Sequence, residues 1–154
     1  MAPDGTMSES SVPNSTRTAA HIKRALIDAG FEVFRTRGDE IALAERPREN
    51  LIMDSGVRLR VADPFEVRIV LRAQKADFPS EEDAQLFDRV RRLASASLAA
   101  GFVETNACVT RMTDPGDPER VLDTFYEITF SKSTSALPDA LAELKIALGV
   151  EKRA

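Results

Sequence analysis

Apolar residues recur at helical spacing in three stretches of the chain. The spacing predicts a first helix over residues 17–29, a second from Ser80, which would cap it, to Gly101, and a third over residues 136–148. The residues that these helices would bury are Ile22, Leu26 and Ala29 in the first, Leu86, Phe87, Val90, Leu93, Ala94 and Leu98 in the second, and Leu137, Leu141, Leu144 and Leu148 in the third. Stripes of this kind suit packing against a sheet, so core packing is favoured over an exposed partner face.

Between the helices, apolar and polar residues alternate with the period of two that is typical of strands. Strands around residues 31–34 and 41–43 flank Arg37-Gly38-Asp39, which predicts a hairpin. The next segments are predicted as a polar connector at 45–50, a further short strand at 51–53, a turn at 54–56 and a strand at 57–61.

The clearest alternation lies in residues 65–74. It places on one face Phe65, Val67, Ile69, Leu71 and Ala73. A second hairpin is predicted from strands at 102–112 and 120–132 about a turn at 114–118. The inward positions of its return strand are Leu122, Thr124, Tyr126, Ile128 and Phe130.

These elements predict an α+β fold with an antiparallel sheet of about five to six strands and three helices. The order is α-β-β-(β)-β-α-β-β-α, with the helices largely on one side of the sheet. Residues 1–16 have no apolar period and predict a flexible N-terminal tail, and residues 17–150 predict a single α+β domain.

Composition narrows the class of protein. The chain has 154 residues, one cysteine and one histidine, and a formal net charge of −4. A single Cys108 excludes an internal disulfide and, with only His21 beside it, argues against a Cys/His metal site. No apolar run has the length of a membrane helix and no signal peptide opens the chain, so we expect a cytoplasmic protein without membrane contact.

Candidate catalytic chemistry is sparse. No glycine-rich phosphate loop is present, His21 has no nucleophile or carboxylate partner in the pattern, and Cys108 suggests a small packing residue. Glu104, Asp123 and Glu127 fall in one predicted hairpin, where surface carboxylates are common. We therefore expect no catalytic residue, no metal, no cofactor and no enzymatic activity.

Arginines are the more informative residues. Arg58, Arg60, Arg68 and Arg72 occupy the outward positions of neighbouring predicted strands, where guanidinium groups suit carboxylate or phosphate. These four form the candidate partner- or anion-binding site. The alternative is that they are neutralised across the strands by carboxylates at the same parity, namely Glu66, Asp123 and Glu127. The net charge, and Phe125 as the one clear aromatic residue on that face, argue against nucleic acid as a partner.

The order of elements over about residues 17–148 resembles the type III secretion chaperone-like fold, which includes secretion chaperones and bacterial sensory-transduction-regulator proteins. The resemblance is one of topology, and it implies a dimeric, non-enzymatic protein that holds extended segments of a partner against its sheet. It transfers no functional residue to this chain.

Two hypotheses of function follow. The first is a non-enzymatic protein-binding adaptor or chaperone-like regulator that docks a partner segment on its sheet. The second is a sensor of a small anionic, phosphate-bearing ligand that uses the arginine-rich sheet face. We expect a protein partner, with a homodimer as the assembly that the resemblance implies.

Overall fold

The computed structural model describes residues 15–154, with side chains described from Thr18 onward. Most of the tail predicted at 1–16 lies outside the described residues. Its last two residues, Ser15 and Thr16, belong to the first helix, which begins at Ser15. Four α-helices are present in the described residues: α2 (Ser15–Asp28), α3 (Asp83–Leu93), α4 (Ser95–Ala99) and α5 (Leu137–Leu148). A short 3₁₀ turn, η1 (Lys75–Asp77), precedes α3.

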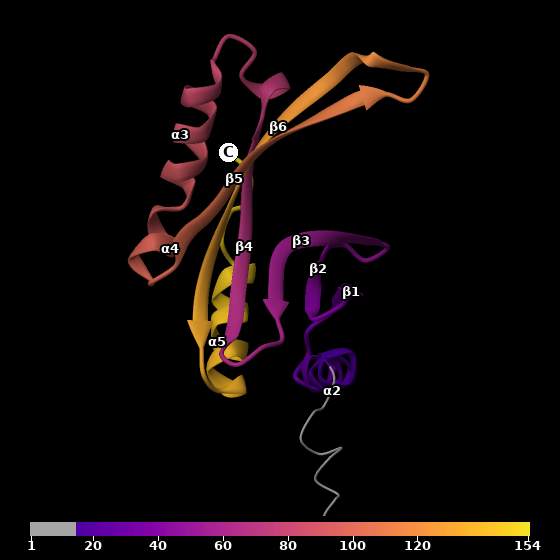
Figure 1. Ribbon diagram of the computed structural model, residues 1–154, viewed down its shortest axis with the longest axis vertical. Helices are drawn as coiled ribbons and strands as arrows, with labels where there is room; N and C mark the ends of the chain where they lie inside the picture. Colours follow the sequence, from indigo (N-terminus) through magenta and orange to yellow (C-terminus); the bar gives the residue numbers. More distant parts are fainter. Residues whose placement is uncertain (1–14) are drawn as a thin grey trace, which may run out of the picture.

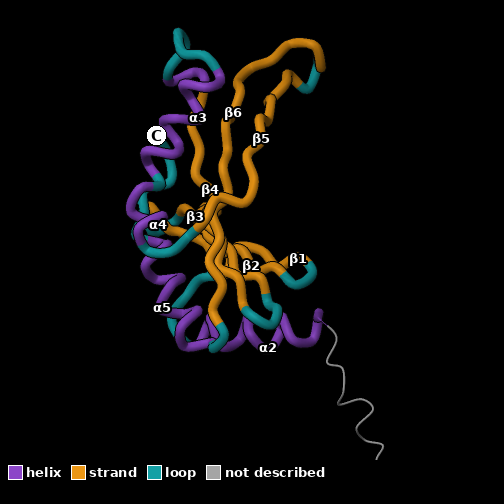
Figure 2. Tube along the Cα trace, turned by 60° about the vertical axis from the view of Figure 1, so that its left-hand side comes forward, coloured by secondary structure: helices purple, strands orange, loops and turns teal. Residues whose placement is uncertain are grey.

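Six strands form one antiparallel sheet, which confirms the α+β class (Figure 1). They are β1 (Val33–Arg37), β2 (Glu40–Arg48), β3 (Leu51–Arg60), β4 (Phe65–Gln74), β5 (Val103–Asp114) and β6 (Asp117–Thr134). Their order across the sheet is β1-β2-β3-β4-β6-β5, so β1 and β5 are the two edges. Helices α3, α4 and α5 lie along one side of the sheet, and α2 lies at its lower end beside β1 and β2 (Figure 2). We call the side of the sheet away from α3, α4 and α5 the open face.

The core lies between the helices and the sheet. The alternation predicted for β4 is confirmed, because Val67, Ile69, Leu71 and Ala73 are all buried. Helices contribute buried side chains that include Leu26, Leu86, Val90 and Leu144. Each of these pieces is amphipathic and becomes stable only when its apolar side meets another element. In the described residues, no helix has both the length and the apolar character needed to cross a membrane.

The second predicted helix is wrong in its details. It is two helices, α3 and α4, interrupted at Ala94, so the structure has four helices where three were expected. The break turns Ser97 toward the core, and Leu98 is left exposed. The cap is Glu82 instead of Ser80, because Glu82 and Gln85 satisfy each other's backbone N–H groups in a capping box.

The polar connector predicted at residues 45–50 is also wrong. These residues extend β2 to Arg48 and lead directly into β3. Their side chains are exposed, so no hydrophobic alternation marked them as a strand. Pro47 is tolerated because the pairing of β2 with β3 is irregular between Glu45 and Arg48.

The turn predicted at 54–56 is a bend inside β3. Gly56 has a φ of +79°, and its N–H donates to Asp54 Oδ1 at 2.9 Å. The bend carries the first half of β3 away from β4, so the paired residues of these strands run only from Val57 to Arg60 on β3.

Beyond the bend, residues 151–154 take the vacated place beside β4. The Arg72 N–H donates to the Lys152 carbonyl at 2.9 Å, and the Ala154 N–H donates to the Arg72 carbonyl at 3.0 Å. The two segments run parallel, with Arg153 opposite Arg72.

The second predicted hairpin is present as β5 and β6. Its outer half projects beyond the helices (Figure 1), and we call residues 103–134 the hairpin arm. Tyr126, Ile128 and Phe130 face inward and are buried, as predicted. Leu122 was expected to face the core, but it is exposed because no helix covers the outer part of the arm.

Candidate binding surfaces on the sheet

The four candidate arginines lie on the open face of β3 and β4. Arg58 is directly opposite Arg68 across the two strands, and Arg60 is opposite Glu66. Arg72 lies further along β4, opposite Glu127 of β6. The structure thus brings three of these side chains into one row along β4 and the adjoining part of β3, with Arg60 at its end.

The two central arginines are paired with carboxylates. Arg58 donates two hydrogen bonds to Asp54, from Nη1 to Oδ1 at 2.6 Å and from Nη2 to Oδ2 at 2.9 Å. Arg68 donates to Glu66 at 2.8 Å and to Glu40 at 2.9 Å. Carboxylates therefore separate two guanidinium groups that would otherwise repel each other across the strands.

The outer two arginines are held less tightly. Arg60 reaches Asp39 at 3.2 Å, and both side chains are well exposed. Arg72 lies 3.9 Å from Glu127, and its guanidinium is 4.9 Å from the centre of the Phe125 ring. The exposed pair of Arg60 with Asp39 contributes little, because water solvates both partners almost as well. Arg72 and Glu127 are half-buried, but they are too far apart for a hydrogen bond.

The expected neutralising carboxylates are present only in part. Glu66 and Glu127 each pair with an arginine, whereas Asp123 accepts hydrogen bonds from Gln74 and from the Ala76 N–H. The sequence reasoning missed Asp39, Glu40 and Asp54. Their positions follow from the bend in β3 and the register of β2, which the predicted connector and turn obscured.

Electrostatics on this face reflect the pairing. Burial opposes ionisation of Asp54, but the hydrogen bonds from Arg58 and the Gly56 N–H outweigh it and lower the pKa of Asp54 below its usual range. Burial likewise opposes the charge of Arg68, and its two glutamate partners outweigh that effect and raise the pKa of Arg68. An incoming anion would have to compete with these carboxylates, since both central arginines are already engaged.

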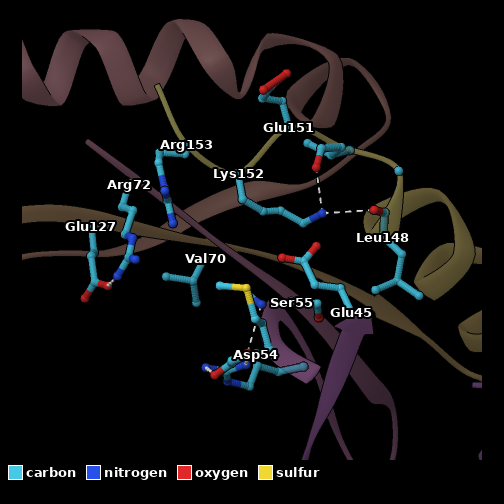
Figure 3. A pocket seen from close by; sticks show the side chains of 15 residues that line it. Glu45, Asp54, Ser55, Val70, Arg72, Glu127, Leu148, Glu151, Lys152 and Arg153 are labelled. Carbon is cyan, nitrogen blue, oxygen red and sulfur yellow. Dashed lines mark hydrogen bonds and ion pairs between the residues drawn. The ribbon is translucent and has the colours of Figure 1, made fainter. Parts of the chain in front are cut away.

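A cavity of about 760 Å³ opens where β3 turns away from β4. Figure 3 shows Lys152 extending across it, with Glu45 and Asp54 on one side and the ion pair of Arg72 with Glu127 on the other. The cavity walls carry four cationic side chains (Arg58, Arg72, Lys152 and Arg153) and four carboxylates (Glu45, Asp54, Glu127 and Glu151). This balance gives the cavity no excess of positive charge for a phosphate.

The outer edge of β5 is a different kind of surface. β5 is 12 residues long and ends the sheet, and no strand in residues 15–154 pairs with its outer edge. Most of its side chains are exposed on both faces. Cys108, which suggested a packing residue, is among these exposed side chains, and His21 is exposed on α2.

Metal ligands do not gather in the described part of the chain, where no group of three or more His, Cys, Asp or Glu side chains could hold an ion. Comparison with known proteins gives no assignment either. No family model matches the chain, and neither the curated proteins nor the solved structures contain a match. The surfaces themselves therefore carry the functional argument.

Proposed function

We propose that this protein is a non-enzymatic adaptor or chaperone-like regulator that binds an extended segment of a partner protein as an added strand along the outer edge of β5. The observation that carries the proposal is the open edge of this strand. A free edge offers a row of backbone donors and acceptors, which give affinity, while alternate side chains of the bound segment give specificity.

The middle of β5 lacks the features that usually block edge pairing. Natural edge strands carry lysines or prolines that prevent pairing with other chains. β5 contains neither, and its residues 105–110 (Thr-Asn-Ala-Cys-Val-Thr) include no charged side chain. The pairing of β5 with β6 is irregular near both ends of β5, between Glu104 and Asn106 and between Met112 and Asp114, and it is regular from Asn106 to Met112. An uncharged partner segment rich in β-branched residues would match this stretch.

The position of the arm favours access by a partner. Its outer part stands clear of the helices in both views (Figures 1 and 2). Apolar side chains are exposed along it, namely Val103, Met112, Val121 and Leu122. Val103 and Met112 lie on β5 itself, next to the edge where a strand would be added, and exposed apolar side chains of this kind mark interaction surfaces.

The strand pairing identifies the backbone groups that would receive the partner. Along a strand, the N–H and C=O of successive residues point to opposite edges. The groups of Arg72 point to residues 152–154, so those of Leu71 point to Ile128 of β6. By the same alternation, Cys108 points its groups to β6, and Ala107 points its groups outward.

This geometry gives a sharp test. Ala107→Pro removes an outward N–H without removing a bond to β6, and Ala107→Val is the matched control that keeps the N–H. Peptides of 12 residues, the length of β5, would be selected from a displayed library on the immobilised full chain. Selected peptides are expected to slow amide exchange at Ala107 and to lose at least roughly tenfold in affinity for the proline variant only. Peptides that bind without protecting β5 would refute the proposal.

The anion-sensor hypothesis has less support, because Arg58 and Arg68 are paired with carboxylates. A thermal-shift series with inorganic phosphate and nucleotides tests it. A shift of several degrees with one of these compounds would favour the sensor over the adaptor.

A further inference from the structure

One set of β5 residues turns its backbone groups to the outer edge of the sheet. The groups of Ile128 in β6 point to β4, and those of every second residue along β6 do the same, so the β5 residues opposite them have their own groups free at the edge. These residues are Glu104, Ala107, Val109 and Arg111. The two charged members of the set lie near opposite ends of the strand, with an acidic residue at one end and a basic residue at the other.

This arrangement of charge makes β5 complementary to an antiparallel copy of itself. Two antiparallel copies place Glu104 of each strand beside Arg111 of the other. Two parallel copies in register would place like charges opposite each other, which destabilises a sheet. Charge therefore favours a second copy of this chain, in antiparallel orientation, as the occupant of the edge.

The irregularity near Glu104 brings the remaining residues into the same register. Glu104 is opposite Phe130 of β6 and Asn106 is opposite the adjacent Thr129, so Thr105 is an extra residue that bulges from the strand. When this extra residue is left out of the count, a twofold axis at the centre of β5 aligns the rest of 103–112 on one copy with the same segment of the other. The aligned pairs are Val103 with Met112, Glu104 with Arg111, Asn106 with Thr110, Ala107 with Val109, and Cys108 with Cys108.

The aligned side chains match in chemistry as well as in position. Val103 and Met112 are 59% and 47% exposed in one copy, and the pairing covers each with the other. Asn106 and Thr110 are both polar and can form a hydrogen bond across the strands. Directly opposite residues share a face of the sheet, so no pair places a charge against an apolar side chain.

Arg111 has no counter-charge within one copy. Among the described residues no carboxylate forms an ion pair with it. Glu104 accepts two hydrogen bonds from Arg91, at 3.0 and 3.1 Å. An ionised carboxylate has about four acceptor positions, so Glu104 can bind Arg91 of its own copy and Arg111 of a second copy at once. The second copy thus supplies the partner that Arg111 lacks.

We infer that β5 of a second copy closes this edge in the free protein, in an antiparallel twofold pair centred on Cys108. The inference rests on strand addition at β5, as the proposed function does, and it adds a regulation of that edge. A partner segment has to displace the second copy, so dimer formation limits access to β5. Ala107 and Val109 exchange backbone hydrogen bonds between the copies, and the two Cys108 residues face each other with Cα atoms about 4.5 Å apart.

Charge exchange between copies tests the pairing. Arg111→Glu and Glu104→Arg each turn both attractive pairs of the dimer into repulsive ones, so either change should weaken dimerisation of the full chain at least roughly tenfold in analytical ultracentrifugation. A mixture of the two variants restores opposite charges at both positions and should form a heterodimer. Lys145→Glu, at an exposed position of α5, is the matched control for charge and should dimerise as the parent chain does. Far-UV circular dichroism checks that each variant is folded.

Thiol cross-linking tests the register. Diamide oxidises two thiols to a disulfide and takes up their hydrogens, and the Cα separation expected at the Cys108 pair lies within the range of about 4.4–6.8 Å that a disulfide spans. The parent chain should therefore form a covalent dimer. Cys108→Ser combined with Thr110→Cys moves the thiol along the same face to a position opposite Asn106 of the other copy, and this variant should not cross-link.

The inference is overturned if the parent chain stays monomeric, if the mixture of charge variants forms no heterodimer, or if the displaced thiol cross-links as readily as Cys108. Its failure is distinguishable from that of the proposed function. A monomeric parent chain whose Ala107 amide is protected by the selected peptides would overturn the dimer and support strand addition by a partner. A charge-dependent dimer whose Arg111→Glu variant binds no peptide would support the dimer and overturn the adaptor.

Discussion

Removal of the Asp54 carboxylate is the most informative perturbation of the open face. Its oxygens accept two hydrogen bonds from Arg58 and one from the Gly56 N–H, all at 2.6 to 2.9 Å. The Arg58 side chain is 17% exposed, so water can replace only part of what Asp54→Ala removes. Hydrogen bonds to charged groups contribute roughly 1.5–3 kcal/mol each, and partial exposure reduces the sum, so we expect a loss of about 2–3 kcal/mol.

Urea unfolding at neutral pH, followed by far-UV circular dichroism, measures this loss directly. In a domain of this size it corresponds to a fall in Tm of roughly 4–12 °C. Asp54→Asn keeps one oxygen, which can accept from the Gly56 N–H and from Arg58 Nη1, but it loses the charge and the acceptor for Arg58 Nη2. It therefore separates the bend from the charge and should cost less. Asp39→Ala removes an exposed ion pair with Arg60 and should cost under about 1 kcal/mol. If Asp54→Ala costs no more than Asp39→Ala, the partly buried pairing of Arg58 with Asp54 has no special role in stability.

Three further predictions concern the core, a partly buried hydrogen bond and a surface ion pair. Leu144→Ala empties a fully buried site and should cost about 2–5 kcal/mol in urea unfolding, whereas Ile146→Ala, exposed on the same helix, should change stability by less than about 0.5 kcal/mol. Tyr126→Phe removes a 2.6 Å hydrogen bond to a carboxylate of α3 and should cost about 1–2 kcal/mol by the same assay. Hydrogen bonds from Arg91 lower the pKa of Glu104, so their effect on stability is present above the usual glutamate pKa and disappears as the pH falls through the lowered value. Arg91→Ala should therefore reduce Tm at neutral pH, and the difference from the parent chain should shrink as the pH falls below the usual glutamate pKa.

The parts of the fold that could be predicted are those with one buried and one solvated side. β4 was recognisable because Val67, Ile69 and Leu71 are buried while their neighbours are not. The strand predicted at 51–53 lies in β3, but the outer part of β2 was missed because residues 45–48 are exposed on both faces, and exposure on both faces produces no alternation. Leu98 was misplaced because a helix break at Ala94 changes the phase of every later residue.

The candidate site was predictable in one respect only. Parity along the strands put Arg58 and Arg68 on one face, and this holds for any pairing that buries the apolar set. The carboxylates that meet them depend on register, which Gly56 and the irregular end of β2 set locally. Residues 150–154 are too few to show a period, and their place beside β4 exists only because β3 leaves it.

The position of β6 in the sheet has a consequence for the order of folding. β6 pairs with β5 through a short local turn, whereas β4 and β6 join Gln74 to Phe125 and Phe65 to Thr134 across a long stretch of chain. Closing the long loop costs more conformational entropy than zipping the hairpin. We therefore expect the hairpin to form first and to serve as the template on which β4 aligns. Mutations that weaken the arm would then slow refolding more than they speed unfolding, even though the arm is the least covered part of the native protein.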